Sequence, residues 1–301
     1  PYYRFSVALY HAAAICVPPG PSIARFYKRV IENRIDLAWI GDPNATLPYP
    51  TDLGPHSLKV VLLYGLKREL HQPLEQKLGI PARESFGMTE VGPGLFMPIE
   101  DVGMSGSGAC GIPSVFRECM VADAEGNAVA AGEIGELLIS GPGMFLGYYN
   151  NPELTQRSFW GKWFRTGDLA RQDERGYFYI VGRIKEMIKR SAENISAQEV
   201  ESALYALPHI LEAAVIGVPD AKRGEEVKAC VVLQSGQTVE SVPPAALVEH
   251  CRTRLATFKL PRYIQYYTEL PKTSSQKIAK KALADGGGIP STRTFDMQDA
   301  P

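Results

Sequence analysis

Residues 57–64 read SLKVVLLY, an almost uninterrupted apolar run that ends at Gly65. A strand of this composition is typically buried on both faces, as in parallel sheets that are covered by helices. A short helical pattern lies between this run and Glu84, and another helix start is expected over 22–31. The alternation of strand and helix predicts an α/β layer, so we expect residues 1–115 to form part of an α/β subdomain.

Residues 116–182 have a different pattern. Short β-rich segments recur between glycine turns, at Cys119–Asp123, Glu136–Ser140 and Tyr177–Val181. This spacing indicates a small antiparallel barrel or sheet. We therefore expect a β-rich subdomain over 116–182, followed by a short connection at 183–185.

The part of the chain from 186 to 285 predicts a compact α+β domain. Ser196 and Glu199 form the S-x-x-E pattern of a capping box, in which each side chain can satisfy an amide of the first helical turn. The pattern then predicts, in order, a helix to about Leu207, strands Ala213–Val218 and Val227–Leu233, a helix over about Ala245–Leu255 and a strand over Tyr263–Leu270. Residues 286–301 are rich in Gly, Ser and Pro, which predicts a disordered tail.

Composition narrows the possible function classes. The 301 residues carry 32 Lys and Arg against 33 Asp and Glu, a net charge of −1, so no basic field attracts nucleic acid or anionic lipid. No apolar run approaches the ~18 residues of a membrane span. The five cysteines are scattered without a C-x-x-C pair, which favours reduced thiols in the cytoplasm. The chain starts at Pro1 without a leader pattern, and we expect it to be a fragment of a longer protein.

One glycine motif, from Gly106 to Gly111, matches the dinucleotide-binding pattern G-x-G-x-x-G. Such a site requires an apolar strand before the glycines and a helix after them. Neither is expected here, because Ile112-Pro113 follows where the helix should start. A glycine turn is the better interpretation.

Four other motifs carry side chains suited to nucleotide chemistry. They are, in order, FGMTE at Phe86–Glu90, WFRTGDL at Trp163–Leu169, GYFYIVGRIKEMIK at Gly176–Lys189 and PKTSSQKI at Pro271–Ile278. A hydroxyl beside a carboxylate at a strand end can donate to a phosphate oxygen and hold Mg²⁺. A carboxylate after a glycine can accept both hydroxyls of a ribose, and a lysine can supply a point charge to phosphate. Taken singly, each motif also fits an ordinary turn or loop.

As an ordered series, these motifs resemble the adenylate-forming superfamily of acyl-CoA synthetases, luciferases and peptide-synthetase adenylation domains. The resemblance covers about residues 58–284. Within it, residues 180–201, IVGRIKEMIKRSAENISAQEVE, look most like bacterial medium-chain and carnitine-type CoA ligases. The fold implied is part of the large amino-terminal domain of the adenylate-forming fold, with α/β and β subdomains, followed by a small α+β carboxy-terminal domain.

The resemblance implies roles for individual residues of the first two motifs. Thr89 would touch the α-phosphate of the nucleotide, and Glu90 would ligate Mg²⁺. Phe86 and Gly87 belong to the same motif and would also lie in the nucleotide site. Asp168 would bind the ribose hydroxyls.

The later motifs are assigned in the same way. Ile180 would lie against the adenosine, and Arg183 would also reach the nucleotide. Lys185 corresponds to the hinge about which the small carboxy-terminal domain rotates between two half-reactions. Lys277 would bridge the substrate carboxylate and the α-phosphate, and Thr89, Glu90 and Lys277 are the expected catalytic residues. Cations are needed there because one anion attacks another.

The chain departs from the family pattern at three places. The Ser/Thr/Gly-rich loop that holds the β- and γ-phosphates does not occur before Thr89, and the family places it upstream of this segment. Gln276 replaces the glycine usual before the final lysine, which restricts φ there. The loop that pantetheine passes, Ser191, Ala192 and Glu193, has alanine where a glycine is common, so the methyl group would approach the pantetheine.

The implied activity is ATP-dependent ligation of a small carboxylic acid to coenzyme A, through an acyl-adenylate and with Mg²⁺. Fatty acid metabolism is the expected setting. The acyl pocket is expected near five residues, namely Tyr64, Gly65, Leu66, Val91 and Gly92. Without the phosphate loop, this chain alone is expected to be inactive. The alternative is a non-catalytic adenylate-binding or interaction module derived from the family.

Overall fold

The structure is a computed structural model that describes residues 13–16, 26–40, 54–65, 68–273 and 277–298. Leu66 and Gln276 therefore lie outside the described residues. The chain divides into two compact units, the first made of residues 1–166 with 170–180 and the second of residues 167–169 with 181–301. Each unit is described by itself.

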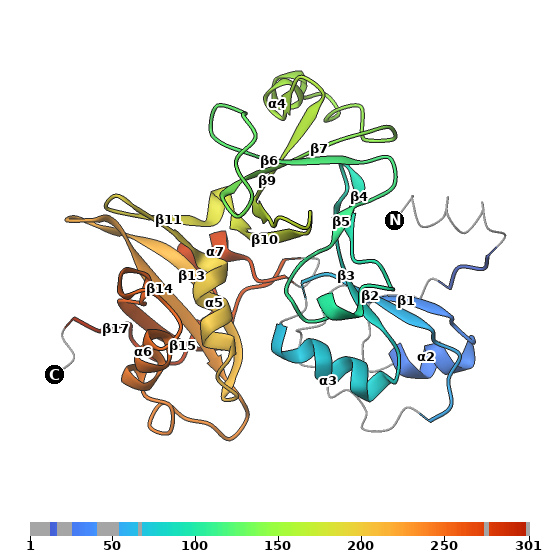
Figure 1. The fold of residues 1–301 in the computed structure, drawn as a ribbon. Helices are drawn as coiled ribbons and strands as arrows, with labels where there is room; N and C mark the ends of the chain where they lie inside the picture. Colours follow the sequence, from blue (N-terminus) through green and yellow to red (C-terminus); the bar gives the residue numbers. More distant parts are fainter. Residues whose placement is uncertain (1–12, 17–25, 41–53, 66–67, 274–276, 299–301) are drawn as a thin grey trace. The chain divides into compact units, whose positions relative to one another are not determined.

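The first sheet of the first unit has five strands in the order β1-β2-β3-β4-β5 (Figure 1). These are β1 Leu37–Ile40, β2 Val60–Leu63, β3 Ala82–Met88, β4 Gly92–Phe96 and β5 Ile112–Pro113. The first three strands are parallel, whereas β4 pairs antiparallel with both β3 and β5. Helices α2 (Phe26–Glu32) and α3 (Arg68–Leu78) precede β1 and β3.

Strand β2 confirms the buried strand predicted at 57–64. Three of its four residues are buried, so both faces of the strand are covered. Val61 and Leu63 share a core with Val30 of α2 and with Leu74 of α3. The strand therefore lies inside an α/β layer, as its continuous apolar sequence predicted.

The second sheet of the first unit has the strand order β10-β9-β7-β6, with β8 paired to β9. Its strands are β6 Glu118–Ala122, β7 Ile134–Ser140, β8 Phe159–Trp160, β9 Trp163–Gln172 and β10 Phe178–Arg183. Helix α4 (Pro152–Arg157) lies between β7 and β8 in the chain. The three segments predicted as strands are confirmed as β6, β7 and β10. Strand β9 was not predicted, because Thr166 and Asp168 occupy buried positions of its alternation where apolar residues would signal a strand.

The segment that matches G-x-G-x-x-G forms turns, and its last glycine lies close to the backbone of Phe96. A 3-10 helix, η2 (Val102–Met104), precedes it, and the short strand β5 follows it where a dinucleotide site would need a helix. Gly111 has φ +109°, and a Cβ there would lie 1.9 Å from the carbonyl oxygen of Phe96. The glycine at this position is required by close backbone approach, and the interpretation as a turn is confirmed.

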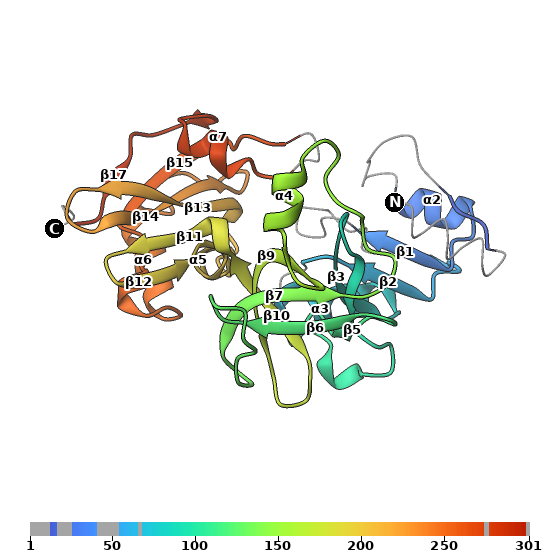
Figure 2. The same cartoon turned by 90° about the horizontal axis from the view of Figure 1, so that it is seen from above.

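The second unit is built on a seven-stranded sheet with the path β12-β11-β14-β15-β16, to which β13 is added beside β14 and β17 beside β15 (Figures 1 and 2). Its elements are η3 Ile184–Glu186, β11 Met187–Arg190, β12 Glu193–Ser196, α5 Ala197–Tyr205, β13 Ile210–Asp220, β14 Gly224–Leu233, α6 Pro244–Arg252, η4 Thr257–Lys259, β15 Tyr263–Glu269, α7 Lys280–Ala284, β16 Ile289–Pro290 and β17 Phe295–Asp296. The predicted order of helix, strand, strand, helix and strand is confirmed.

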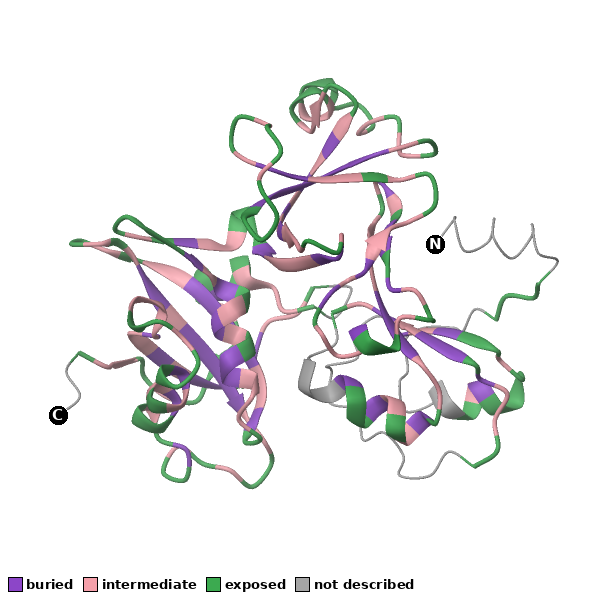
Figure 3. Cartoon of the chain, in the orientation of Figure 1, coloured by how far each residue is buried: buried purple, intermediate pink, exposed green. Residues whose placement is uncertain are grey.

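Both faces of this sheet are covered, and successive residues of one strand face different cores. On β13, Ala213 and Val215 belong to the core with α5 and α6. Ala214 and Ile216 belong to a second core that includes Leu283 of α7. Figure 3 shows the resulting concentration of buried residues along β13 and β14. Strands with two buried faces explain the continuous apolar sequences in this part of the chain.

Half of the predicted capping box is found at the start of α5, where Ser196 caps the helix while Glu199 pairs with Lys259. Ser196 is the N-cap, and its hydroxyl accepts a hydrogen bond from the amide of Glu199 at 3.3 Å. The carboxylate of Glu199 accepts two bonds of 2.7 Å from Lys259.

The tail is a correction to the sequence analysis, which predicted disorder from Gly286 onward. Strands β16 and β17 both pair with β15. Arg262 forms an ion pair of 2.9 Å with Asp296, and the ring of Phe295 meets that of Tyr266 edge-on at 6.2 Å. Residues 286–298 are ordered because these tertiary contacts outweigh the Gly- and Ser-rich composition. Among the described residues, no helix combines the length and the apolar character needed to cross a membrane.

Candidate functional site

The FGMTE motif lies where β3 turns into β4. Phe86 and Gly87 lie near the end of β3, which finishes at Met88, and the pairing with β4 is irregular between them. A Cβ on Gly87 would lie 2.6 Å from the carbonyl oxygen of Gly92, so the close approach of the two strands requires glycine. Thr89 follows in the turn and is exposed, which leaves its hydroxyl accessible to a ligand.

Glu90 occupies the same turn and is held from outside it. The Tyr148 hydroxyl donates to Glu90 Oε1 at 3.0 Å, and the Phe145 amide donates to the Glu90 carbonyl at 2.8 Å. No group of three or more His, Cys, Asp or Glu side chains converges within the described ranges. A single carboxylate nevertheless fits Mg²⁺, which usually takes one or two carboxylates together with substrate phosphates and water.

Asp168 and Arg183 come together across β9 and β10. The Arg183 guanidinium donates to both Asp168 oxygens, from Nε at 2.7 Å and from an amino nitrogen at 3.4 Å. The aspartate side chain is 4% exposed, whereas that of the arginine is 55% exposed. The carboxylate is therefore buried while its partner reaches solvent, an arrangement that a polar ligand with hydroxyl groups can join.

Burial raises the pKa of Asp168 above its ordinary value, and the hydrogen bond and charge of Arg183 oppose that rise. A weaker opposing effect comes from the charge of Lys277. The structure thus pairs two of the predicted site residues, Asp168 and Arg183, and the charge of Lys277 acts on the same carboxylate.

Lys277 precedes α7 and forms two hydrogen bonds with Thr273. The Thr273 amide donates to the Lys277 carbonyl at 2.7 Å, and the Lys277 amide donates to the Thr273 hydroxyl at 3.2 Å. Lys272 and Ile278 form a bridge on either side. The Lys277 side chain is exposed, as a residue that meets a substrate would be.

The predicted hinge residue Lys185 is exposed in the 3-10 helix η3. The division between the two units falls between Ile180 and Val181, a few residues before it. Ser196 donates to the Val181 carbonyl at 2.6 Å, so the cap of α5 holds the start of this segment. Ile180 is half-buried and packs against the core of the second sheet.

A charged cluster that was not predicted from the sequence holds the end of η3 at Glu186. Lys280 of α7 donates to Glu186 of η3, and it lies 2.8 Å from a carboxylate oxygen of Glu201 on α5. The Lys280 and Glu186 positions are 94 residues apart in the chain, and no local motif connects them. The cluster joins η3, α5 and α7.

The predicted pantetheine loop is the tight turn between β11 and β12. Ser191 and Ala192 connect the paired residues Arg190 and Glu193. The left-handed conformation falls on Ser191, which has φ +56°. Two-residue hairpin turns of this kind favour glycine at that position. The approach of the Ala192 methyl group to pantetheine is a separate matter, and it stays a prediction.

Two residues of the predicted acyl pocket lie at the end of β2. Tyr64 is half-buried, and Gly65 has φ +69° and donates its amide to Glu84 at 3.2 Å. Val91 is fully buried in the core of the second sheet, which argues against a place in a pocket wall. Gly92 begins β4 and is half-buried.

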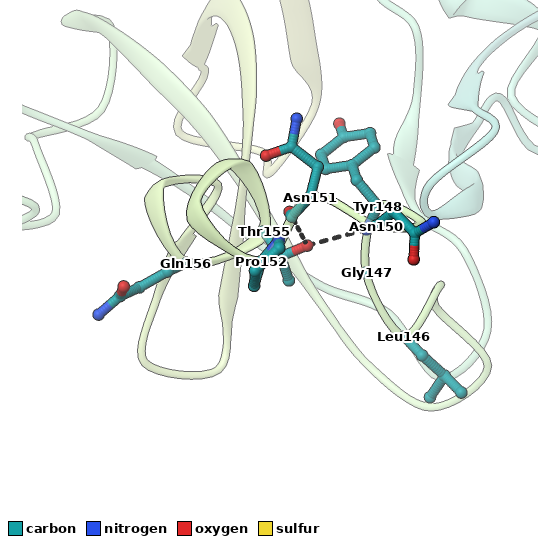
Figure 4. A pocket seen from close by; sticks show the side chains of 8 residues that line it. All are labelled: Leu146, Gly147, Tyr148, Asn150, Asn151, Pro152, Thr155 and Gln156. Carbon is teal, nitrogen blue, oxygen red and sulfur yellow. Dashed lines mark hydrogen bonds between the residues drawn. The ribbon is translucent and has the colours of Figure 1, made fainter.

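A surface hollow of about 510 Å³ lies at the amino-terminal end of α4 (Figure 4). Its lining consists of Leu146, Gly147, Tyr148, Asn150, Asn151, Pro152, Thr155 and Gln156. Of these, only Tyr148 contacts a predicted site residue, through its bond to Glu90.

These side chains define a class of site, in which a buried carboxylate, an arginine and a lysine can meet a polar, anionic ligand. Comparison with known families identifies the class. The AMP-binding enzyme family matches residues 17–149, and the AMP-binding enzyme C-terminal domain matches residues 199–277. The chain belongs to the AMP-binding enzyme family.

Two CoA ligases are among the similar proteins. The chain is 37% identical to sulfoacetate–CoA ligase of Cupriavidus necator, over 72% of this chain and 42% of that protein. It is 36% identical to crotonobetaine/carnitine–CoA ligase of Salmonella agona, over 78% of this chain and 45% of that protein. The chain thus spans less than half the length of these curated relatives.

The fold matches solved structures as well. One is the O-succinylbenzoate coenzyme A synthetase of Bacillus subtilis in complex with ATP and a magnesium ion, with a TM-score of 0.82 and 26% identity. The match covers 94% of this chain and 58% of that one. The architecture is therefore that of part of an adenylate-forming enzyme, a mixed α/β fold with its carboxy-terminal domain.

Proposed function

We propose that the full-length protein is an ATP-dependent carboxylic acid–CoA ligase. The observation that carries the proposal is the pair of buried Asp168 and exposed Arg183, in a chain whose family is AMP-binding enzymes. The relatives named as CoA ligases support coenzyme A as the thiol acceptor.

In the first half-reaction, a carboxylate oxygen of the acid attacks the α-phosphorus of ATP. A new P–O bond forms, the bond to the β-phosphate oxygen breaks, and pyrophosphate leaves. Lys277 would lie against the carboxylate and the α-phosphate, where negative charge accumulates in the transition state. Thr89 would donate its hydroxyl to an α-phosphate oxygen, and Asp168 would accept the ribose hydroxyls.

In the second half-reaction, the sulfur of coenzyme A attacks the acyl carbon, a C–S bond forms and AMP leaves with the electron pair of the broken C–O bond. The thiol proton is released on the way. The turn at Ser191 and Ala192 would lie beside the pantetheine. Rotation about Lys185 would exchange the residues of the two half-reactions.

Glu90 would hold Mg²⁺ when the nucleotide is bound. The ion would offset phosphate charge during adenylation. The donor set fits this task, since a single carboxylate in an accessible turn leaves room for the phosphate oxygens to complete the coordination.

The test is pyrophosphate release by the full-length gene product, with ATP and Mg²⁺, across a panel of short, medium and aromatic carboxylic acids. We expect release with at least one acid and formation of its CoA thioester. Tight AMP binding without pyrophosphate release from any acid would contradict the ligase and favour a non-catalytic adenylate-binding module.

The 301-residue chain provides a second comparison. We propose that it binds AMP through Asp168 and Arg183 but gains little affinity from the β- and γ-phosphates, and that it releases no pyrophosphate. A chain of these residues alone that turns over ATP would show that phosphate is bound by other side chains. Light scattering on the same sample would report whether the chain associates.

A further inference from the structure

The loop between β7 and α4 contacts Glu90 at two points. The Tyr148 hydroxyl donates to Glu90 Oε1 at 3.0 Å, and the Phe145 amide donates to the Glu90 carbonyl at 2.8 Å. One contact orients the side chain and the other fixes the backbone. Tyr148 and Glu90 are 58 residues apart in the sequence, so the contact is a product of the fold.

The first anchor of this loop is aromatic. The Phe145 ring lies 5.3 Å from that of Phe164 and 5.7 Å from that of Phe159. It also meets the Tyr148 ring edge-on at 4.9 Å. Edge-to-face and offset aromatic pairs of this kind add to the burial of the rings and favour one arrangement of the loop. Phe145 therefore holds Tyr148 beside the core of the second sheet.

The second anchor is the first turn of α4 (Figure 4). The Tyr148 amide donates to the Thr155 hydroxyl oxygen at 2.9 Å, and that hydroxyl donates to the Asn151 carbonyl at 3.0 Å. Asn151 caps α4 by accepting from the Leu154 amide at 3.0 Å. A Cβ on Gly147 would lie 2.8 Å from a Thr155 carbon, so the loop and helix are in close contact.

We propose that Tyr148 is a positioning residue for the magnesium ligand Glu90, an inference that rests on the proposed function. Glu90 is only half-buried and lies in a turn, so the turn alone does not fix the direction of its carboxylate. Mg²⁺ requires near-ideal octahedral geometry, with oxygens at about 2.0–2.1 Å. The Tyr148 hydroxyl uses one acceptor site of Oε1, and an ionised carboxylate has further acceptor sites for the ion.

The experiment measures ATP binding to the full-length protein by calorimetry at a series of free Mg²⁺ concentrations. Tyr148→Phe removes the hydroxyl and keeps the ring. The Mg²⁺ concentration at half-maximal enhancement of ATP affinity should rise about 10-fold or more, as for other groups that orient a metal ligand. Affinity at saturating Mg²⁺ should return toward that of the wild type. Formation of Mg·ATP in solution is common to all variants and cancels in the comparison.

Tyr149→Phe is the matched control, because the neighbouring tyrosine is 94% exposed. Its Mg²⁺ curve should overlay the wild type. Glu90→Gln tests the proposed function separately, since it should remove most of the Mg²⁺ enhancement. If Glu90→Gln retains the wild-type curve, the metal assignment fails.

If Glu90→Gln loses the enhancement while Tyr148→Phe keeps the wild-type curve, the ligand role stands and the positioning role is overturned. Should Tyr148→Phe fail to fold, Thr155→Val replaces it, because it removes the oxygen that accepts from the Tyr148 amide. A shift of the Thr155→Val curve toward higher Mg²⁺ supports the proposal, and an unshifted curve overturns it.

Discussion

Replacing Lys280 with methionine should destabilise the second unit by about 3 kcal/mol. Lys280 lies between Glu186 and Glu201, and the three side chains are 21%, 36% and 14% exposed. Removing one partner of a buried ion pair typically costs about 3–5 kcal/mol, because a charge stays buried without compensation. The low end applies here, since water reaches Glu186 and the Val215 amide still donates to Glu201 at 2.7 Å.

The loss should depend on pH in a defined direction. Burial raises the pKa of Glu201 above its ordinary 4.5 even though Lys280 opposes the rise. A carboxyl whose pKa is raised on folding favours the folded state below its unfolded pKa, and this contribution is lost as pH rises through its folded pKa. Without Lys280 the pKa of Glu201 rises further. The difference between variant and wild type should therefore be smallest near pH 4 and grow toward neutral pH.

The assay exploits the position of the tryptophans. Trp39, Trp160 and Trp163 all lie in the first unit, so urea unfolding followed by fluorescence reports on that unit. Far-ultraviolet circular dichroism reports on both. At a slope of about 1.5 kcal/mol per molar urea, a loss of 3 kcal/mol lowers the midpoint of the second unit by about 2 M.

Lys281→Met is the control, because Lys281 is the exposed neighbour on α7. We expect Lys280→Met to shift a transition seen by circular dichroism and to leave the fluorescence midpoint in place. Equal midpoints for Lys280→Met and Lys281→Met by circular dichroism would refute the reasoning, since the cluster would then contribute no more than a surface lysine.

Three further changes have distinct expected results. Lys277→Ala in the full-length enzyme should reduce acyl-adenylate formation at least ~10²-fold, as for other lost electrostatic donors. Thioester formation from supplied acyl-AMP should be spared, and equal loss in both half-reactions would contradict the role of Lys277. Asp168→Ala should weaken binding of an acyl-adenylate analogue in calorimetry, since each charged hydrogen bond contributes ~1.5–3 kcal/mol. The affinity of the wild type for the same analogue should decline as pH falls toward the raised pKa of Asp168. Ser191→Gly should stabilise the second unit by up to ~1 kcal/mol in urea unfolding because it relieves a left-handed serine, whereas Ala192→Gly should not.

Most elements of the fold could be predicted because their signals are local. The continuous apolar run at 57–64 and the periodic segments from 196 to 270 each identify an element without knowledge of its neighbours. The ordered tail could not be predicted, because its order depends on Arg262 and on the edge of β15, which are tertiary partners. Composition alone describes what such a segment does in isolation.

In the candidate site, too, local motifs could be predicted from the sequence and tertiary partners could not. Motifs identified Asp168, Arg183 and Lys277 in the sequence; all three belong to one unit, and the first two form an ion pair. Tyr148, which contacts Glu90, and Lys280, which contacts Glu186 next to the predicted hinge residue, carried no motif of their own. Their partners lie 58 and 94 residues away, so only the folded chain reveals them.

Strand β9 lacked a clear strand signal in the sequence, and it carries the predicted site residue Asp168. Its inward positions alternate between Phe164, Thr166, Asp168 and Ala170, and the two polar residues obscure the strand signal. Both need compensation when buried: Thr166 donates to the Leu137 carbonyl at 2.7 Å, and Asp168 accepts from Arg183. An apolar residue at 168 would give a better strand and would not require an ion pair. The departure at Asp168, where an exposed arginine offsets the cost of burial, is what we expect of a position kept for binding rather than for stability.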